Sequence, residues 1–269
     1  MTLISVNGHI ADAETLGFPI HDAAYLYGFG CFETLRIVDG TPELWGPHLA
    51  RLMASATFLD IEIPFSASEL KDQFMTLRNR QKPGERLQTC NIYLSAGDRK
   101  AGISSFSDVK VIMVIRPYTS SIQPEDPGVE TFIQVEQAPR NLYSGHKLMS
   151  YLPSIMEQRR AAPRTPLLAS VSGELYETPT ASILGIKDDT LWVNDSPLVL
   201  PSVTAQFCVE RWDSWGYACK RTPFKVDDLA RFSEIFLVNA MGVTPVRSVE
   251  GYPGLASGVQ TKRFSALFQ

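Results

Sequence analysis

Two residues of the chain, Lys147 and Glu177, have surroundings that could support chemistry on an amine. Lys147 follows a Ser-Gly-His turn and precedes the mainly apolar run 148–152. Proline is tolerated only in the first turn of a helix, so Pro153 predicts a helix that begins near residues 150–152. A helix N-terminus and burial both disfavour an ammonium group, which would leave a neutral, nucleophilic amine at Lys147. The alternative is a loop lysine whose head lies in water.

Glu177 lies 30 positions after the lysine (177 − 147), in the segment ELYETPTASILGI. This segment is otherwise largely apolar and is predicted to form a strand. A carboxylate in such a strand either faces outward into water or faces inward beside a cation. Both alternatives remain open from the segment alone.

Three further features could bind an anion. LPSVTAQF opens a predicted helix after a strand, where the backbone amides of Val203 and Thr204 could hold one. VNAMGV places Asn239 and Ala240 in a turn of small residues after another strand. Arg51 is a lone guanidinium on an apolar helix. The alternatives are an ordinary helix start, an ordinary strand end and an arginine that extends over its apolar stem into water.

Composition excludes several classes of protein. The 269 residues carry a net charge of −4 and are 44% hydrophobic and 20% charged, which is typical of a globular chain of one or two domains. No stretch reaches the roughly 20 apolar residues of a membrane span, and the start of the sequence does not resemble a signal peptide. The absence of a basic cluster argues against nucleic acid as a partner. The four cysteines are widely scattered and lack the spacing of metal ligands: Cys31, Cys90, Cys208 and Cys219. This pattern indicates a cytoplasmic protein whose thiols are reduced and mostly buried.

The elements that must position these residues fall into two groups. The first group is predicted as a hairpin at 3–12, a strand-turn-strand at 31–45, helices at 47–61 and 66–81, and strands at 89–97 and 109–118. Ser66 or Ser68 is expected to cap the second helix. The second group is predicted as strands at 130–137, 167–172, 174–178, 181–187 and 190–193, a strand-turn-helix at 200–216, and two strands within 234–251. The sequence therefore predicts an α/β protein with a small domain at 1–118, a linker at 119–128 and a larger, strand-rich domain at 129–269.

Taken together, these residues form an ordered set that resembles the fold-type IV pyridoxal-phosphate enzymes. The set comprises Gly-Phe-Gly-Cys-Phe-Glu-Thr-Leu-Arg at 28–36, His-Leu-Ala-Arg-Leu at 48–52, Lys147, Tyr151-Leu152, Glu177, Val203-Thr204, Asn239-Ala240 and Thr244-Pro245-Val246. The resemblance runs from about residue 3 to about residue 250. It implies a two-domain α/β (α+β) fold, with a small N-terminal α/β domain and a larger pseudo-barrel domain, and a homodimer.

The resemblance also implies roles for individual residues. Lys147 would hold the aldehyde of pyridoxal 5'-phosphate as a Schiff base and then act as acid and base on a small-molecule amine substrate. Glu177 would pair with the pyridine nitrogen and keep the ring an electron sink. The cofactor phosphate would be bound by Arg51, Val203, Thr204, Asn239 and Ala240. Tyr151 matches a tyrosine that some members place against the 3-oxygen of the cofactor, with a core aromatic as the alternative.

The chain departs from the family pattern at several positions. Members usually carry Asp-Arg-Gly where this chain has Asp-Ala-Ala at 22–24. They also differ from this chain at positions 29, 150, 182 and 205. The departing residues are Ala23, Ala24, Phe29, Ser150, Ser182 and Ala205. None of them removes a cofactor contact made by the backbone, the lysine or the glutamate.

Substrate assignment rests on fewer residues. D-Amino-acid aminotransferases resemble one another in an arginine that binds substrate carboxylate at a strand-end turn, where this chain has Ala96. Arg99 or Lys100 could bind a carboxylate instead, or both could be exposed charges. The segment FGCFETLRIVDG resembles 4-amino-4-deoxychorismate lyase, with Thr34 in the place of its active-site threonine.

The lyase resemblance implies a specific reaction. Lys147 would abstract a proton from 4-amino-4-deoxychorismate, and the products would be pyruvate and 4-aminobenzoate, a precursor in folate biosynthesis. The alternative is a class IV aminotransferase that acts on branched-chain or D-amino acids and shares every cofactor contact.

Overall fold

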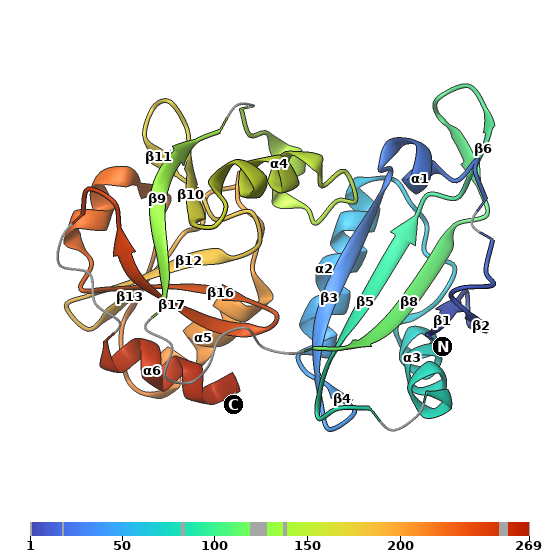
Figure 1. Cartoon of the computed structure of the whole chain (residues 1–269), viewed down its shortest axis with the longest axis horizontal. Helices are drawn as coiled ribbons and strands as arrows, with labels where there is room; N and C mark the ends of the chain where they lie inside the picture. Colours follow the sequence, from blue (N-terminus) through green and yellow to red (C-terminus); the bar gives the residue numbers. More distant parts are fainter. Residues whose placement is uncertain are drawn as a thin grey trace. The chain divides into compact units, whose positions relative to one another are not determined.

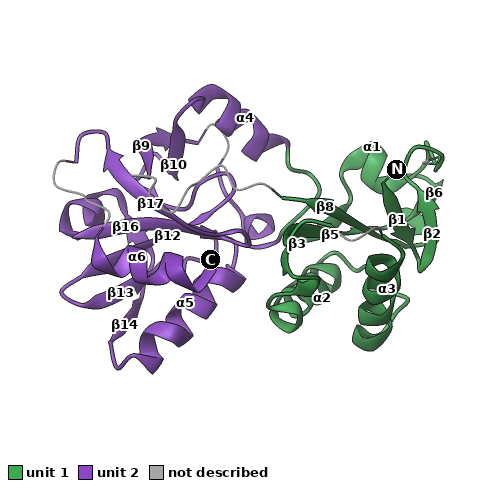
Figure 2. Cartoon of the chain, turned by 60° about the horizontal axis from the view of Figure 1, so that its bottom comes forward, with its two compact units in different colours: residues 1–119, 147–151 green, residues 120–146, 152–269 purple. Residues whose placement is uncertain are grey.

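The computed structural model describes residues 2–17, 19–81, 84–118, 128–136, 139–252 and 258–268. Figures 1 and 2 show two compact units, of which the first comprises Met1–Thr119 and Lys147–Tyr151. The second comprises Ser120–His146 and Leu152–Gln269. The segment with Lys147 thus belongs to the first unit, whereas the sequence assigned all of 129–269 to the second domain. Residues 119–127 of the predicted linker lie outside the described residues.

Unit 1 is built on a six-stranded antiparallel sheet in the order β2-β1-β8-β5-β3-β4. Its elements are β1 (Leu3–Val6), β2 (His9–Asp12), α1 (Ala23–Tyr27), β3 (Gly30–Val38), β4 (Thr41–Pro42), α2 (Trp45–Phe58), α3 (Ala67–Arg80), β5 (Leu87–Ser95), β6 (Asp98–Ala101), β7 (Ser105–Ser107) and β8 (Lys110–Pro117). Helices α2 and α3 cover one face of the sheet and share a buried core with alternate residues of β3, β5 and β8 (Figure 2). The strands β6 and β7 form a separate two-stranded sheet.

Local sequence signals explain several of these elements. Asn7 and Gly8 have positive φ angles of 49° and 82°, as the predicted hairpin turn requires. Ser66 caps α3 in a capping box with Glu69, which confirms one of the two predicted caps. The predicted strand that was to end at Trp45 is wrong, because β4 spans only two residues and Trp45 already begins α2. There its ring packs against Phe74 of α3, with 5.3 Å between ring centroids.

The segment Lys147–Tyr151 joins unit 1 because it pairs with the start of β3. The Phe32 N–H donates to the Lys147 carbonyl oxygen, and the Met149 N–H donates to the Gly30 carbonyl oxygen, each at 2.9 Å. A Cβ added at Gly30 would lie 2.9 Å from the Met149 sulfur and 2.2 Å from the Leu94 carbonyl oxygen. Glycine is therefore required where β3 meets the lysine segment.

Unit 2 is built on a nine-stranded mixed sheet in the order β14-β13-β12-β16-β17-β9-β10-β11-β15. Its strands are β9 (Val129–Val135), β10 (Thr165–Ala169), β11 (Glu174–Leu175), β12 (Ser182–Lys187), β13 (Thr190–Val193), β14 (Cys219–Arg221), β15 (Phe224–Lys225), β16 (Glu234–Asn239) and β17 (Gly242–Val249). Its helices are α4 (Leu152–Ala161), α5 (Val203–Ser214) and α6 (Val259–Ser265), with 3₁₀ turns at Leu142–Gly145, Val226–Arg231 and Ala266–Phe268. Helix α4 begins at Leu152 with Pro153 in its first turn, as predicted.

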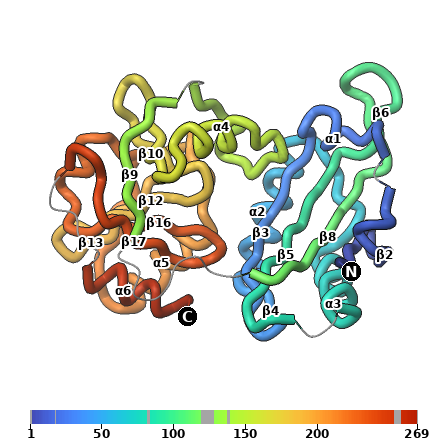
Figure 3. The backbone as a smooth tube through the Cα atoms, in the orientation of Figure 1, coloured from blue at the N-terminus to red at the C-terminus, as the bar shows by residue number. Residues whose placement is uncertain are grey.

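Two hydrophobic cores lie on opposite faces of this sheet. One core joins α5 and α6 to β12, β13 and β16, and Trp212 and Phe264 are fully buried in it. The other core contains Leu167 of β10, Phe224 of β15 and Leu237 of β16, which lie far apart in the strand order. Strands so distant can share one core only if the sheet curls around it, which agrees with the predicted strand-rich pseudo-barrel. Figure 3 follows the backbone through β17, β9 and β10, which are neighbouring strands of this sheet.

The cysteines are free, and burial raises the pKa of the Cys31, Cys90 and Cys208 thiols to about 12. Cys219 is half-buried. Of the helices in the described ranges, none combines the length and the apolar character needed to cross a membrane.

Candidate active site

The amine of Lys147 stands against aromatic rings of unit 1. Its Nζ lies 4.5 Å from the centroid of the Phe32 ring and 5.6 Å from that of Tyr151. Phe32 meets Tyr151 edge to face and stacks on Tyr93, with centroid separations of 5.6 and 5.9 Å. Lys147 is half-buried, and these contacts favour a head packed on aromatic rings over one surrounded by water. The rings favour the protonated amine through cation–π attraction, which opposes the expected effect of the nearby helix start.

Thr34 lies on the same face of the sheet as Phe32, two positions further along β3. Asn91 of β5 is directly opposite Thr34, and its Nδ2 donates to the Thr34 Oγ1 at 2.9 Å. The predicted catalytic residues Lys147, Thr34 and Tyr151 thus all belong to unit 1. Asn91 was not identified from the sequence, since a single asparagine in a strand carries no periodic signal.

Arg51 lies on the opposite, helix-covered side of β3, in a buried cluster. Its Nε and Nη2 donate to the two carboxylate oxygens of Glu33 at 2.7 and 2.8 Å, and His48 Nδ1 lies 2.8 Å from Glu33 Oε2. Burial alone would raise the pKa of Glu33, but the hydrogen bonds from Arg51 and His48 outweigh it and hold the pKa below its usual value. The alternative of an arginine reaching into water is wrong, because its side chain is only 14% exposed. Its contact with a phosphate stays a prediction.

The two charges predicted to bind a substrate carboxylate differ in their surroundings. Lys100 pairs with Asp108 at 3.0 Å, and both side chains are more than half exposed, which favours the alternative of a solvent-facing charge. Arg99 donates through Nη1 to the Tyr27 hydroxyl at 2.6 Å, and its backbone N–H donates to the His21 carbonyl oxygen at 2.9 Å. Arg99 is exposed like Lys100, so both fit the alternative of exposed charges, and binding of a substrate carboxylate by either one stays a prediction.

A buried ion cluster fixes the start of β6, which carries Arg99. Asp22 is fully buried and accepts from Lys110 Nζ at 3.2 Å and from Ser95 Oγ at 2.7 Å. Lys110 also pairs with Asp98, the first residue of β6. Burial lowers the pKa of Lys110, but its hydrogen bonds to Asp98 and Asp22 outweigh that effect and raise it. The sequence did not identify this cluster, whose members come from separate elements.

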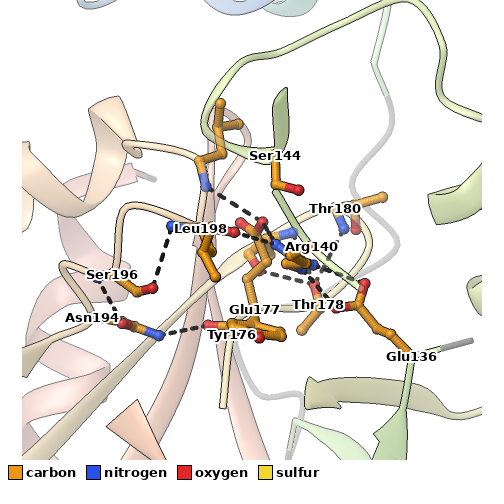
Figure 4. Close-up of polar contacts among 12 residues, drawn as sticks. Glu136, Arg140, Ser144, Tyr176, Glu177, Thr178, Thr180, Asn194, Ser196 and Leu198 are labelled. Carbon is orange, nitrogen blue, oxygen red and sulfur yellow. Dashed lines mark hydrogen bonds and ion pairs between the residues drawn. The ribbon is translucent and has the colours of Figure 1, made fainter. Parts of the chain in front are cut away.

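Glu177 lies in unit 2, outside the strand predicted for it. Strand β11 ends at Leu175, and the chain turns after Glu177 because Thr178 Oγ1 accepts from the Ala181 N–H at 2.8 Å. The Glu177 carboxylate is 13% exposed and is paired with Arg140 (Figure 4). Of the two alternatives, the inward orientation beside a cation is confirmed.

Arg140 is the cation that the sequence did not identify. Its Nη1 donates to Glu177 Oε1 and, at 3.1 Å, to the Leu198 carbonyl oxygen, while its Nε donates to Glu136 Oε2 at 2.7 Å. Its Cζ lies 4.8 Å from the centroid of the Tyr176 ring. Burial alone would lower the pKa of Arg140, but the charges of Glu177 and Glu136 outweigh it and raise the pKa. The guanidinium thus stays charged and fixes the position of Glu177.

The predicted anion-binding residues of unit 2 lie near the Glu177 segment. The Leu200 N–H donates to Glu177 Oε1 at 3.4 Å, three residues before α5 begins at Val203. Ser202 caps α5, and both Val203 and Thr204 are buried, with exposed fractions of 8% and 2%.

Asn239 ends β16 just before Ala240, and its Nδ2 donates to the Thr180 carbonyl oxygen at 3.3 Å. Thr180 follows Glu177 by three residues, so the turn after β16 contacts the Glu177 segment. The segment before α5 contacts Glu177 as well, through the Leu200 N–H. The roles of this turn and of the start of α5 toward a phosphate stay predictions.

Known proteins resemble the chain over nearly its whole length. A D-alanine aminotransferase from Listeria monocytogenes serotype 4b (strain F2365) is 24% identical, with 92% of this chain and 88% of that protein covered. An aminodeoxychorismate lyase from Bacillus subtilis (strain 168) is also 24% identical, with 99% and 94% covered. The PLP-bound form of a hypothetical aminotransferase from Mycobacterium tuberculosis shares the fold, with a TM-score of 0.86 at 21% identity and 99% and 97% of the two chains covered.

The family described as "Amino-transferase class IV" matches residues 30–249, which include Lys147, Glu177 and every predicted phosphate contact. This match confirms the resemblance drawn from the ordered motifs. The chain therefore belongs to the class IV aminotransferase family.

Proposed function

We propose that the chain is a pyridoxal 5'-phosphate enzyme that converts 4-amino-4-deoxychorismate into 4-aminobenzoate and pyruvate. Family membership supports pyridoxal phosphate as the cofactor. The relatives that match nearly the whole chain include a protein named aminodeoxychorismate lyase. The same comparisons include aminotransferases at equal identity, so the choice between the two reactions rests on residues of this chain.

The donor set fits the cofactor. A phosphorylated pyridine aldehyde needs an amine, a carboxylate for the ring nitrogen, and N–H groups for the phosphate. The described residues supply the amine of Lys147, the anchored carboxylate of Glu177 and the capped N-terminus of α5. Residues proposed to hold the cofactor are Lys147, Glu177, Arg51, Val203, Thr204, Asn239 and Ala240. When bound, the cofactor supplies an electron sink that stabilises negative charge on the substrate carbon.

Lys147 is proposed to move the proton. Its amine takes the proton from the substrate carbon that carries the amino group, and it becomes an ammonium. The Phe32 and Tyr151 rings, with centroids 4.5 and 5.6 Å from Nζ, stabilise that ammonium. The C–O bond of the ether then breaks, and the leaving enolpyruvate takes up a proton to become pyruvate. The ring left behind is aromatic, so the protein has to place the proton and the substrate rather than supply the driving force.

The observation that carries the lyase assignment is the position of Thr34. Its hydroxyl lies on the same sheet face as Phe32, against whose ring the Lys147 amine stands. A polar group at this place can contact the body of a substrate whose amino carbon is at the lysine. Ala96 is buried at the turn before Gly97, where it offers no charge to the carboxylate of a D-amino acid.

Pyruvate release tests this assignment. Protein loaded with pyridoxal phosphate is incubated with 4-amino-4-deoxychorismate, and pyruvate is measured through lactate dehydrogenase without any keto acid added. The lyase predicts stoichiometric pyruvate and 4-aminobenzoate. A strict requirement for a keto-acid acceptor, with amino transfer from D-alanine or a branched-chain amino acid, contradicts the lyase and supports the aminotransferase.

A further inference from the structure

We infer that Asn91 is a positioning residue that makes the Thr34 hydroxyl a hydrogen-bond donor to an acceptor oxygen of the substrate. The inference rests on the proposed function for the identity of the substrate. It is drawn from the pairing of β3 with β5 and from the direction of one hydrogen bond.

The two residues are held together by strand register. Thr34 of β3 is paired directly with Asn91 of β5, and residues so paired on one face have Cβ atoms about 5 Å apart. The neighbouring pair on the same face is Phe32 with Tyr93, and the Lys147 Nζ lies 4.5 Å from the centroid of the Phe32 ring. Positions two residues apart in a strand, such as Phe32 and Thr34, are about 7 Å apart. One small substrate molecule could therefore contact both the Thr34 hydroxyl and the Lys147 amine at the Phe32 ring.

The direction of the hydrogen bond fixes the role of the hydroxyl. A threonine hydroxyl has one proton and two acceptor sites, whereas an asparagine NH2 only donates. Asn91 Nδ2 donates to Thr34 Oγ1 at 2.9 Å, which occupies one acceptor site and directs the threonine proton to another partner. Val114 of β8 flanks Asn91 on its other side and is 6% exposed. An apolar neighbour there leaves the asparagine amide directed toward Thr34.

The proposed substrate offers matching acceptors. It carries two carboxylates and an ether oxygen, in addition to the carbon from which Lys147 is proposed to take a proton. A hydroxyl that donates to a carboxylate forms a strong, charge-assisted hydrogen bond. Asn91 acts through Thr34 and is not itself placed in contact with the reacting atoms.

Asn91→Asp gives the sharpest test, because a carboxylate accepts where the amide donates. The Thr34 proton would then bond to residue 91 and be lost to the substrate. The KM for 4-amino-4-deoxychorismate should rise about tenfold or more, with kcat changed less than about twofold. Thr34→Val should raise KM by a similar factor, and Thr34→Ser, which keeps the hydroxyl, should restore most of the affinity.

A double variant and a matched control separate this role from a structural one. If Asn91 acts through Thr34, Asn91→Leu combined with Thr34→Val should be no worse than Thr34→Val alone, and leucine adds no charge that could repel the substrate carboxylates. Asn79→Asp makes the same chemical change as Asn91→Asp at an exposed position of α3 and should leave KM unchanged. Calorimetric titration with chorismate, which has a hydroxyl in place of the reacting amine, measures the same loss as a dissociation constant without turnover.

The outcomes distinguish this inference from the proposed function. Wild-type protein that releases no pyruvate defeats the lyase, and the variants are then compared in amino transfer, where the substrate also carries a carboxylate. Asn91→Asp that matches wild type in KM and in chorismate affinity overturns the inference. A double variant whose rise in KM equals the product of the rises in the two single variants overturns the inference as well, since the two residues would then act independently.

Discussion

The Arg140 guanidinium holds the Glu177 carboxylate from 37 positions away in the sequence. Arg140 also donates to Glu136, so one cation serves two carboxylates that are only 13% and 14% exposed. Figure 4 shows the guanidinium between these two acids. Glu177 is thereby fixed in place by the protein itself, which is what a partner for a ring nitrogen requires.

Arg140→Met should destabilise the protein by about 3–5 kcal/mol, because it leaves both carboxylates in a nearly buried site without their cation. Urea unfolding monitored by circular dichroism measures the change. Arg247→Met is the matched control, since its ion pair with Glu130 is about half exposed on both sides. That control should cost less than about 1 kcal/mol. Equal losses in the two variants would show that the Arg140 network contributes no more than a surface pair.

Glu177→Gln should leave the fold intact and slow turnover by about 100-fold or more, since the amide keeps the shape of the side chain and loses its charge. Steady-state pyruvate release measures the loss, and the unfolding midpoint of the same sample serves as the control for folding. Normal turnover in this variant would remove Glu177 from its proposed role.

The Glu33 cluster predicts a dependence of stability on pH. The pKa of Glu33 is lower in the folded protein than its value of about 4.3 in an unfolded chain, so its ionised form stabilises the fold above that pH. Glu33→Gln should therefore cost about 3 kcal/mol at neutral pH, where His48 and Arg51 lose their buried partner.

The loss of unfolding free energy in Glu33→Gln should shrink as the pH falls from about 6 to about 3. In this range wild-type Glu33 takes up a proton and becomes uncharged, like the glutamine of the variant. Urea midpoints of wild type and variant over this range give the difference directly. A difference that stays constant with pH would contradict the lowered pKa of Glu33.

Gly30→Ala should damage both stability and activity. The added methyl would lie 2.2 Å from the Leu94 carbonyl oxygen and 2.9 Å from the Met149 sulfur, so β3 would have to move away from both β5 and the lysine segment. The expected loss is about 1–3 kcal/mol in unfolding free energy, with reduced turnover. Gly46→Ala is the control, since a Cβ there meets nothing within 4 Å and helix α2 should tolerate it. Wild-type activity in Gly30→Ala would contradict the close approach.

The sequence predicted features that depend on near neighbours. Asn7-Gly8 predicted a hairpin turn, Ser66 was one of the two caps expected for α3, and Pro153 limited where α4 could begin. The ordered motifs also led to the right family. Each of these signals is contained within a few residues, or within a pattern already characteristic of the family.

The sequence missed features that depend on distant partners. Strand β11 was predicted to continue through Glu177, but the turn made by Thr178 and Ala181 ends the extended segment. Arg140 and Asn91 could not be identified, because their partners lie 37 and 57 residues away. The lysine segment was assigned to the wrong unit for the same reason, since its partner strand begins more than a hundred residues earlier.

Every step proposed for the reaction requires the cofactor to be attached to Lys147. Active protein loaded with pyridoxal phosphate is reduced with borohydride, digested and analysed by mass spectrometry, with Lys147→Ala treated in parallel. We expect a pyridoxyl group on the peptide that contains Lys147 and none on any peptide of the variant. An unmodified Lys147 peptide from active, reduced protein, or a label on a different lysine, would contradict this attachment.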